Sequence, residues 1–323
     1  MDNFLQTKAL IQNLYNKKIV PNASFALIKD GQVQTNYLGN TTWQSHQPVN
    51  KNNLYDIASL TKVVATTMLV LKLVKEKKLS LDDTVHQWLP EFSDNRVTLR
   101  HLLTHTSGIE GYIENRNQLN PDQLKSALIH LPVTDNFDKV VKYTDTGLIY
   151  LGFIFEKNYQ KPAQQVLMEE TILPLKLNHT TFNPDKSLCI PTENDLQGIV
   201  HDPKAQILGI HCASAGLFSN LNDLVKFSQY ILTSNDELLN NLFQPWTDVV
   251  PQRSIGWDLR HDPIDNHCLI YHTGFTGTFM LLDKQNQSGM IVLTNRVNPR
   301  KDNELFLVHR DYIVDSFLRE NNG

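Results

Sequence analysis

The spacing of apolar residues changes along the chain, and each change indicates a different kind of secondary structure. Residues 4–15 carry apolar side chains at helical intervals, which predicts an amphipathic helix. Two extended runs, 23–28 and 32–38, are separated by an Asp-Gly pair that is typical of the turn in a β-hairpin. Over 60–245 the spacing is mainly helical and is interrupted by prolines and loops.

Strand-like runs return at 254–259, 268–272, 278–282 and 290–295, before a terminal helix around 303–319. Strands at both ends with helices between them predict an α+β fold, in which an antiparallel sheet from both termini is flanked by helices and a mainly helical domain is inserted. We expect the sheet domain to comprise 1–60 plus 246–323 and the helical domain to comprise 61–245. The cleft between them is the expected place for an active site.

Length and composition indicate a globular protein with a large core. The chain has 323 residues, of which 41% are hydrophobic, and a formal net charge of −4 at pH 7. These values exclude a disordered tail protein, and the lack of a basic stripe excludes a general nucleic-acid-binding protein. The three cysteines, Cys189, Cys212 and Cys268, are far apart, so we expect buried free thiols rather than disulfides or a metal site.

The first residues of the sequence bear on its location. Residues 1–5 include an acidic residue and lack the basic start and continuous apolar block of a signal peptide. No stretch approaches the roughly 20 apolar residues that a membrane span requires. The protein as written is therefore expected in the cytoplasm, and outside the cell if a signal segment has been trimmed.

Ser59-Leu60-Thr61-Lys62 is the strongest candidate for chemistry. Residues three apart on a helix are neighbours on its surface, so the Lys62 amine can reach the Ser59 hydroxyl. Ser59 is expected near a helix N-terminus, where free backbone N–H groups favour developing negative charge. A lysine desolvated beside an apolar helix has a lowered pKa, which suits a base that activates a serine nucleophile.

Two further motifs follow in chain order. The segment 143–145 (Tyr-Thr-Asp) precedes a second apolar helix, and the segment 272–274 (His-Thr-Gly) ends a strand-like run. With Ser59 they resemble the motifs Ser-x-x-Lys, Tyr-x-Asn and Lys-Thr-Gly of the serine penicillin-recognising enzymes. Residues 102–109 and 214–219 also resemble segments of class C β-lactamases. The chain is therefore identified as a member of the class C β-lactamase-like family, which includes low-molecular-weight penicillin-binding proteins, D-amino-acid peptidases and serine esterases.

The resemblance implies a β-lactamase/transpeptidase-like fold and a mechanism. Ser59 would attack a carbonyl carbon while Lys62, Tyr143 or both accept its proton. The backbone N–H groups of Ser59 and Phe275 would form the oxyanion hole. The residues expected to bind the substrate are Asp145, His272, Thr273 and Gly274. No cofactor or metal ion is implied, and the expected partners are a small-molecule or peptide substrate and β-lactams as covalent ligands.

Asp145 and His272 depart from the family motifs. Asp145 replaces an asparagine; its carboxylate would favour the charged form of Lys62 and shift proton abstraction towards Tyr143, or it would instead cap the helix that starts at Thr146. His272 replaces a lysine and is only partly charged near neutrality, so substrates with a carboxylate should be held less firmly. We expect ester or amide hydrolysis first, D-alanyl-D-alanine carboxypeptidase activity second and β-lactamase activity last. A catalytically silent penicillin-binding sensor is the alternative from another class.

Other patterns in the sequence argue against a zinc site and against an α/β-hydrolase. His101 and His105 are four residues apart, but no glutamate completes a His-Glu-x-x-His zinc site. The segment 212–216 lacks the first glycine of Gly-x-Ser-x-Gly, which argues against an α/β-hydrolase. The segments 110–138 and 183–210 are expected to form the rim of the cleft.

Overall fold

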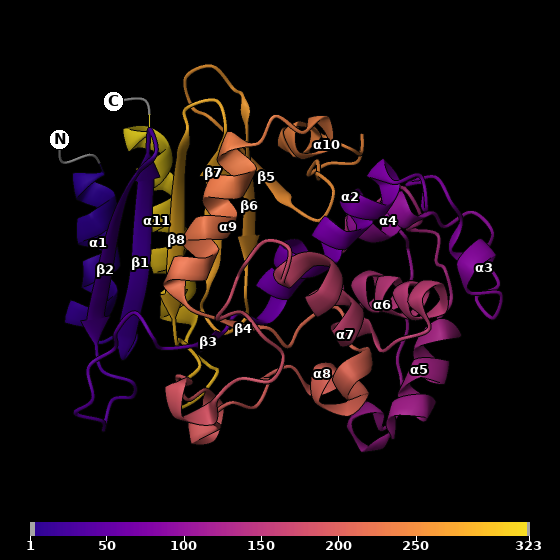
Figure 1. The fold of residues 1–323 in the computed structure, drawn as a ribbon, viewed down its shortest axis with the longest axis horizontal. Helices are drawn as coiled ribbons and strands as arrows, with labels where there is room; N and C mark the ends of the chain where they lie inside the picture. The colour runs from indigo at the N-terminus through magenta and orange to yellow at the C-terminus, as the bar shows by residue number, and fades with distance from the viewer. Residues whose placement is uncertain (1–3, 322–323) are drawn as a thin grey trace.

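A central antiparallel sheet organises the protein, which a computed structural model describes over residues 4–321. The strands of this sheet are β1 (Asn22–Lys29), β2 (Gln32–Gly39), β5 (Asp258–His261), β6 (Cys268–Thr273), β7 (Phe279–Asp283) and β8 (Ser288–Thr294). They follow the order β2-β1-β8-β7-β6-β5, so the first hairpin of the chain pairs with the last strand (Figure 1). The predicted α+β fold, with a sheet built from both termini, is confirmed.

Strand β5 begins later than the sequence pattern indicates. Residues 254–257 form a turn instead, in which the Ser254 N–H donates to the Trp257 carbonyl at 3.1 Å. Gly256 within this turn has a φ of +77°, which an extended strand cannot contain. The regular pairing with β6 therefore starts at Asp258.

Helices cover both faces of the sheet and fill the space beside it. The helices are α1 (Leu5–Asn16), α2 (Thr67–Lys75), α3 (Val85–Trp88), α4 (Leu99–Leu103), α5 (Pro121–Ile129), α6 (Thr146–Tyr159), α7 (Ala163–Leu167), α8 (Pro203–Leu208), α9 (Leu221–Thr233), α10 (Glu237–Asn240) and α11 (Glu304–Glu320). Alternate residues of β1 point to opposite faces: Phe25 and Leu27 pack with α1 and α11, whereas Ala26 and Ile28 join the larger core that contains α9. Figure 1 shows α9 lying across the sheet on the side opposite α11.

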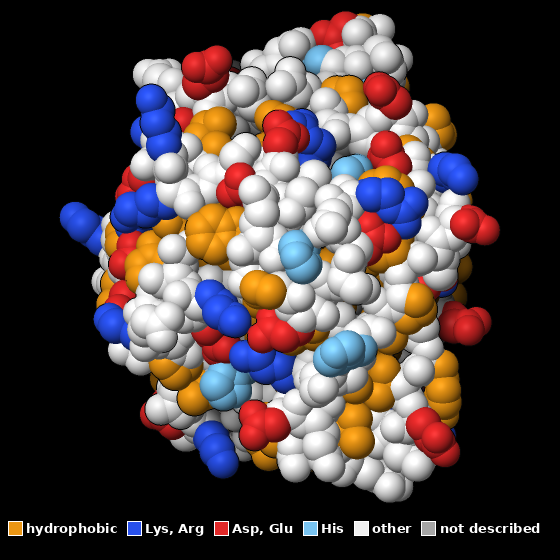
Figure 2. All heavy atoms as spheres, turned by 90° about the vertical axis from the view of Figure 1, so that its right-hand side faces the viewer, with side chains coloured by type: hydrophobic (Ala, Val, Ile, Leu, Met, Phe, Trp, Pro, Cys, Tyr) orange, Lys and Arg blue, Asp and Glu red, His pale blue; other side chains and the backbone are white. Residues whose placement is uncertain are grey.

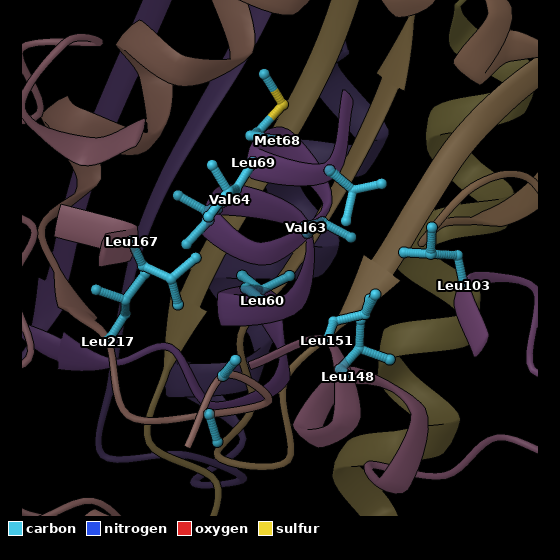
Figure 3. Close-up of a cluster of buried hydrophobic side chains, with 14 of the residues drawn as sticks. Leu60, Val63, Val64, Met68, Leu69, Leu103, Leu148, Leu151, Leu167 and Leu217 are labelled. Atoms are coloured by element: carbon cyan, nitrogen blue, oxygen red, sulfur yellow. The ribbon is translucent and has the colours of Figure 1, made fainter. Parts of the chain in front are cut away.

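The segment that carries Ser59 and Lys62 is helical, but its first turns are irregular. Ala58–Leu60 is a 3₁₀ turn, Lys62–Thr66 is a π-helical turn, and α2 continues from there. Figure 3 shows its apolar side chains between leucines of α4 and α6 on one side and Leu167 and Leu217 on the other. Because this helix is packed on several sides, it holds the functional side chains on a rigid support.

The mainly helical segment does not lie wholly apart from the sheet. Helix α9, which belongs to 61–245, packs against β1 and β8, and one continuous core includes residues of the sheet and of the helices. A second, two-stranded sheet joins β3 (Tyr55–Asp56) to β4 (Phe218–Ser219) just before Ser59. The division into two domains at 60 and 245 stays a prediction.

The cysteines and the surface add three findings. All three cysteines are free; Cys189 and Cys212 are buried as expected, whereas Cys268 is partly exposed because it begins β6 beside the edge strand β5. No helix among residues 4–321 is both long enough and apolar enough to cross a membrane. Acidic and basic side chains are interspersed on the face that Figure 2 shows.

Candidate active site

Ser59 and Lys62 meet one helical turn apart, as predicted. The Lys62 Nζ atom donates to Ser59 Oγ at 2.7 Å and to the Ser214 carbonyl at 2.9 Å. The Lys62 side chain has an exposed fraction of 0%, so few water molecules compete for these contacts. The amine is therefore held against the hydroxyl from within the core.

Asp145 supplies a third contact to the Lys62 amine. Its Oδ1 atom lies 2.7 Å from Lys62 Nζ, and its Oδ2 atom lies 2.6 Å from Lys204 Nζ. Asp145 stands immediately before α6, but its side chain makes no capping hydrogen bond to that helix. The capping alternative is therefore wrong, because both carboxylate oxygens face lysines. The other alternative, in which the carboxylate acts on Lys62, agrees with this placement.

The charge state of Lys62 differs from the sequence expectation. Burial disfavours its charged form, but the charge of Asp145 and the contact with Tyr143 outweigh burial, so the pKa of Lys62 lies above its usual value. Burial also opposes the charged form of Asp145, yet the two lysines hold the pKa of its carboxyl well below the usual range. Lys62 is thus an ammonium at neutral pH in the resting state, and the expectation of a lowered pKa was wrong because it left out a partner from another helix.

Tyr143 lies beside these groups at the mouth of a pocket. The Lys62 Nζ atom is 5.4 Å from the centroid of its ring, and the ring packs against the His105 imidazole with centroids 4.6 Å apart. Tyr143 is 46% exposed, whereas Lys62 is buried. The phenol is therefore the more accessible of the two groups predicted to accept a proton from Ser59.

His272 lies behind the pocket rather than in its wall. Its ring is buried, with Nδ1 3.0 Å from the Thr273 carbonyl and its centroid 6.0 Å from that of Tyr143. Burial and the charges of Arg253 and Lys62 hold the pKa of His272 well below its usual value. The imidazole is therefore neutral near pH 7 rather than partly charged. Thr273 lines the pocket and His272 does not, so a direct contact between His272 and a substrate stays a prediction.

The turn between β6 and β7 is hydrogen-bonded to the segment that precedes Ser59. The Thr276 hydroxyl donates to the Asp56 carbonyl at 2.7 Å, and the Thr278 hydroxyl donates to the Ile57 carbonyl at 3.2 Å. Gly274 permits this approach, because a Cβ atom there would lie 2.5 Å from the Ile57 carbonyl oxygen. The third motif thus positions the backbone next to Ser59.

Phe275 follows on this turn and lines the same pocket as Ser59. An oxyanion hole formed by the N–H groups of these two residues stays a prediction. The Arg296 Nε atom donates to the Phe275 carbonyl at 2.7 Å, which holds this peptide unit in place. The half-exposed ring stacks on His201 with centroids 5.3 Å apart and lies 4.6 Å from the guanidinium carbon of Arg296. Phe275 therefore forms a wall of the pocket with its ring.

Asp56 belongs to the site but was not predicted from the sequence. Its Oδ1 atom accepts from the Ala58 N–H at 2.8 Å, and its Oδ2 atom accepts from the His201 N–H at 2.7 Å. Ala58 has a φ of +47°, which is uncommon for a residue with a side chain, so the carboxylate stabilises the bend that presents Ser59. Burial raises the pKa of Asp56 to about 6 against these hydrogen bonds. No local pattern links Asp56 to His201, which is distant in the sequence.

A pocket of about 360 Å³ opens beside Ser59. Its lining residues are Ala58, Ser59, Tyr143, Asp145, Glu193, His201, Asp202, Pro203, Ala215, Thr273, Phe275 and Lys301. A neighbouring pocket of about 590 Å³ shares Tyr143 and Asp145 and is lined further by residues within 111–118. Both segments expected at the rim, 110–138 and 183–210, therefore contribute to this part of the surface.

His101 and His105 do not form a common metal site. The His101 Nδ1 atom lies 2.9 Å from the Thr98 hydroxyl, and the His101 side chain caps the start of α4. His105 is buried against Tyr143, and burial holds the pKa of its imidazole well below the usual value. The two rings thus serve a helix cap and the packing of Tyr143.

Another group of potential metal ligands lies elsewhere on the sheet. Single ligand atoms of Asp262, His267 and Asp283 lie within 4.8 Å of one another. Both ring nitrogens of His267 already contact carboxylates, Nδ1 that of Asp265 at 2.5 Å and Nε2 that of Asp283 at 2.9 Å. This arrangement is an ion-pair network, and a metal ion would have to displace one of these contacts.

Comparisons with known proteins identify the family of the chain. Residues 7–312 match the family model described as Beta-lactamase. The chain is 25% identical to an N-acetylmuramyl-L-alanine amidase of Bacillus subtilis (strain 168), across 88% of this chain and 80% of that protein. It is also 25% identical to a putative D-alanyl-D-alanine carboxypeptidase of Escherichia coli (strain K12), across 88% of this chain and 82% of that protein.

Solved structures share the fold over nearly the whole chain. A β-lactamase/D-alanine carboxypeptidase from Pseudomonas syringae has a TM-score of 0.79 at 19% identity, covering 97% of this chain and 99% of that chain. A class C β-lactamase has a TM-score of 0.81 at 19% identity, covering 99% and 97%. Another, in complex with cefoxitin, has a TM-score of 0.77 at 20% identity, covering 96% and 97%. At these identities the solved structures show a shared fold, which is that of the class C β-lactamases and D-alanine carboxypeptidases. Because the family model spans most of the sequence, the chain belongs to the β-lactamase family.

Proposed function

We propose that this protein is a serine hydrolase that cleaves ester or amide bonds through an acyl-enzyme on Ser59. The observation that supports this most strongly is the contact of Lys62 Nζ with Ser59 Oγ at 2.7 Å, at the edge of an open pocket. A buried amine that merely stabilised the fold would not need a hydroxyl that faces a pocket. The membership in the β-lactamase family supports the same chemistry.

The proposed reaction begins with the attack of Ser59 Oγ on the carbonyl carbon. Because Lys62 is an ammonium that donates to Oγ, it does not accept the proton of Ser59. The proton passes instead to the oxygen of Tyr143, which reacts as a phenolate whose negative charge the nearby Lys62 cation stabilises. The tetrahedral oxyanion is held by the N–H groups of Ser59 and Phe275. The leaving group takes the proton from Tyr143, and a water molecule then repeats the sequence to release the acid and regenerate Ser59.

The substrate class follows from the charges around the pocket. His272 is neutral where the family motif has a lysine, so no fixed cation from that position holds a substrate carboxylate. The carboxylates of Glu193 and Asp202 also line the pocket and repel a carboxylate on the substrate. Neutral esters and amides therefore rank first.

Peptides that end in D-alanyl-D-alanine are the second candidate. Lys301, an exposed cation, lines the same pocket and could contact a terminal carboxylate. One relative is described as a putative D-alanyl-D-alanine carboxypeptidase, and another as an N-acetylmuramyl-L-alanine amidase. A β-lactam substrate, which also carries a carboxylate, likewise ranks below the neutral esters and amides.

Parallel assays of purified protein test this proposal. A chromogenic short-chain ester, a D-Ala-D-Ala peptide and a chromogenic cephalosporin are compared, and intact mass after each incubation reports an adduct. We expect ester turnover that is lost in Ser59→Ala and kept in Ser126→Ala, a control serine on the exposed face of α5. A stable β-lactam adduct without turnover would instead identify a penicillin-binding protein. No turnover and no adduct with any compound would identify a silent binding module and overturn the proposal.

A further inference from the structure

Asp145 is the centre of a cluster with two cations and one anion. One oxygen lies 2.7 Å from Lys62 Nζ and the other 2.6 Å from Lys204 Nζ. The exposed fractions of the Lys62, Asp145 and Lys204 side chains are 0%, 17% and 17%, so water and salt screen these charges weakly. Lys204 thus acts on the same carboxylate as the amine that contacts the nucleophile.

The position of Lys204 is set by its own helix. It lies in the first turn of α8, after Pro203, and the Asp202 side chain caps that turn by accepting from the Ala205 N–H at 2.8 Å. The Asp202 carboxylate is 3.8 Å from Lys204 Nζ, farther than Asp145. Lys204 therefore approaches Asp145 from a backbone that is fixed independently of the Ser59 helix.

We propose that Lys204 is a positioning residue of the active site, which neutralises Asp145 through its contact with Oδ2 and directs Oδ1 towards Lys62. The carboxylate of Asp145 orients the Lys62 amine towards Ser59. Because Lys204 balances its negative charge, Asp145 can do this as an uncharged asparagine would, and no unbalanced negative charge is left beside Tyr143. This role rests on the proposed function, because it concerns the same proton transfer. Lys204 acts through Asp145 and need not touch the substrate.

Other charged or titratable groups surround the cluster. Tyr143 precedes α6, His105 and Arg253 come from neighbouring loops, His272 comes from β6, and Asp202 precedes α8. Burial holds the pKa values of both histidines well below their usual range, so these rings are neutral near pH 7. Arg253 keeps its positive charge because even a lowered guanidinium pKa lies far above neutrality. Lys204 is the cation in direct contact with the second oxygen of Asp145.

The sign of the expected effect does not depend on which group accepts the proton. Removing a cation raises the pKa of a neighbouring base, so the rising limb of activity against pH should move to higher pH in Lys204→Gln. Removing the anion in Asp145→Asn should move the limb to lower pH. The variant with both changes restores the charge balance, and its limb should lie close to that of the parent.

The experiment measures kcat and KM for 4-nitrophenyl acetate from acidic to alkaline pH in these variants. We expect Lys204→Gln to shift the limb upward by roughly one pH unit, with a loss in kcat rather than a rise in KM, and Lys204→Arg to restore the parent profile. Lys161→Gln is the matched control, since it breaks an exposed ion pair with Glu169 of the same 2.6 Å length. A control that shifts equally would assign the effect to general charge and overturn the inference.

The failures of the two proposals are distinguishable. If the parent neither turns over the ester nor is acylated on Ser59, the proposed function fails and the inference fails with it. If the parent is active and Lys204→Gln keeps its profile, the inference alone is wrong. Thermal unfolding of the parent, Lys204→Gln, Asp145→Asn and the variant with both changes separates a defect in folding from a change in proton transfer. If the variant with both changes is no more stable than Lys204→Gln or Asp145→Asn, the charge-balancing role is also wrong.

Discussion

Lys62 and His267 are both nitrogen bases that contact carboxylates, but they differ in what else surrounds them. Lys62 Nζ lies 2.7 Å from Asp145 and 2.7 Å from Ser59 Oγ, beside a pocket. The two ring nitrogens of His267 contact Asp265 and Asp283, and none of these three residues lines that pocket. The Lys62 cluster holds the Ser59 hydroxyl at the pocket, whereas the His267 cluster links strand β7 to the turn before β6.

This contrast teaches that a shifted pKa does not by itself identify an active site. Burial opposes the charged form of both bases, yet their carboxylate partners raise the pKa of Lys62 and that of His267. The distinguishing features are the hydroxyl in contact with the amine and the access of substrate to that hydroxyl. Changes in the two clusters should therefore have separable effects.

The largest expected effect is that of Lys62→Met on catalysis. Methionine fills a similar volume but cannot donate to Ser59 or stabilise charge near Tyr143, so kcat for the ester should fall by about 10³-fold. The fold should remain, because Asp145 keeps its contact with Lys204. Steady-state kinetics and circular dichroism check both parts, and a loss in kcat below about tenfold would contradict the assigned role.

The next effect is that of His267→Gln on stability. Glutamine cannot replace both imidazole contacts, so the buried Asp283 carboxylate loses a charged partner and the free energy of unfolding should fall by about 1–3 kcal/mol. Ester hydrolysis should stay at the parent level. Urea unfolding measures the change, with His261→Gln at the exposed end of β5 as control. A matching loss of kcat in the folded variant would remove the distinction between the clusters.

A smaller change is expected for Asp145→Asn in the dependence of activity on pH. The negative charge of Asp145 favours the protonated form of the neighbouring proton acceptor, so its removal should move the rising limb of the rate profile to lower pH by about one unit. The measurement is kcat/KM for the ester against pH. An unchanged profile would exclude Asp145 from the tuning of the base and leave it a structural role.

The smallest effect concerns how stability depends on pH. The pKa of His267 is raised, so its contribution is fully present below the unfolded-state value of about 6.5 and is lost as pH rises through the folded-state value. The melting temperature of the parent should therefore decline from pH 6 to alkaline pH more than that of His267→Gln. Parallel slopes for the two proteins would refute this contribution.

Local patterns were sufficient to predict much of the fold. Helix α1, the β1–β2 hairpin and strands β6 to β8 follow from the period of apolar residues, because each element buries one side against the core. Strand β5 was predicted to begin too early, since a period of apolar residues does not reveal the left-handed turn at Gly256. The division into two domains at 60 and 245 stays a prediction, and helix α9 packs on the sheet from within the helical segment.

The site was predictable where its residues share a helix or a motif. Ser59 and Lys62 are three residues apart, and their contact follows from helical geometry. Asp56 and Lys204 were missed, because their partners come from other elements and no sequence pattern connects them. His272 was expected to be partly charged, but an imidazole buried near Arg253 is neutral.

By itself, the sequence determined that an alcohol and an amine lie on one face of a helix, because three intervening peptide units fix that distance wherever the helix forms. Only the tertiary structure decided that this amine is charged, because Asp145 reaches it from the residue before α6 and Lys204 reaches Asp145 from α8. Electrostatic interactions depend on distance and burial rather than on position in the chain. The protonation of this amine is therefore a property of the folded protein, whereas the identity of the nucleophile is already present in the chain.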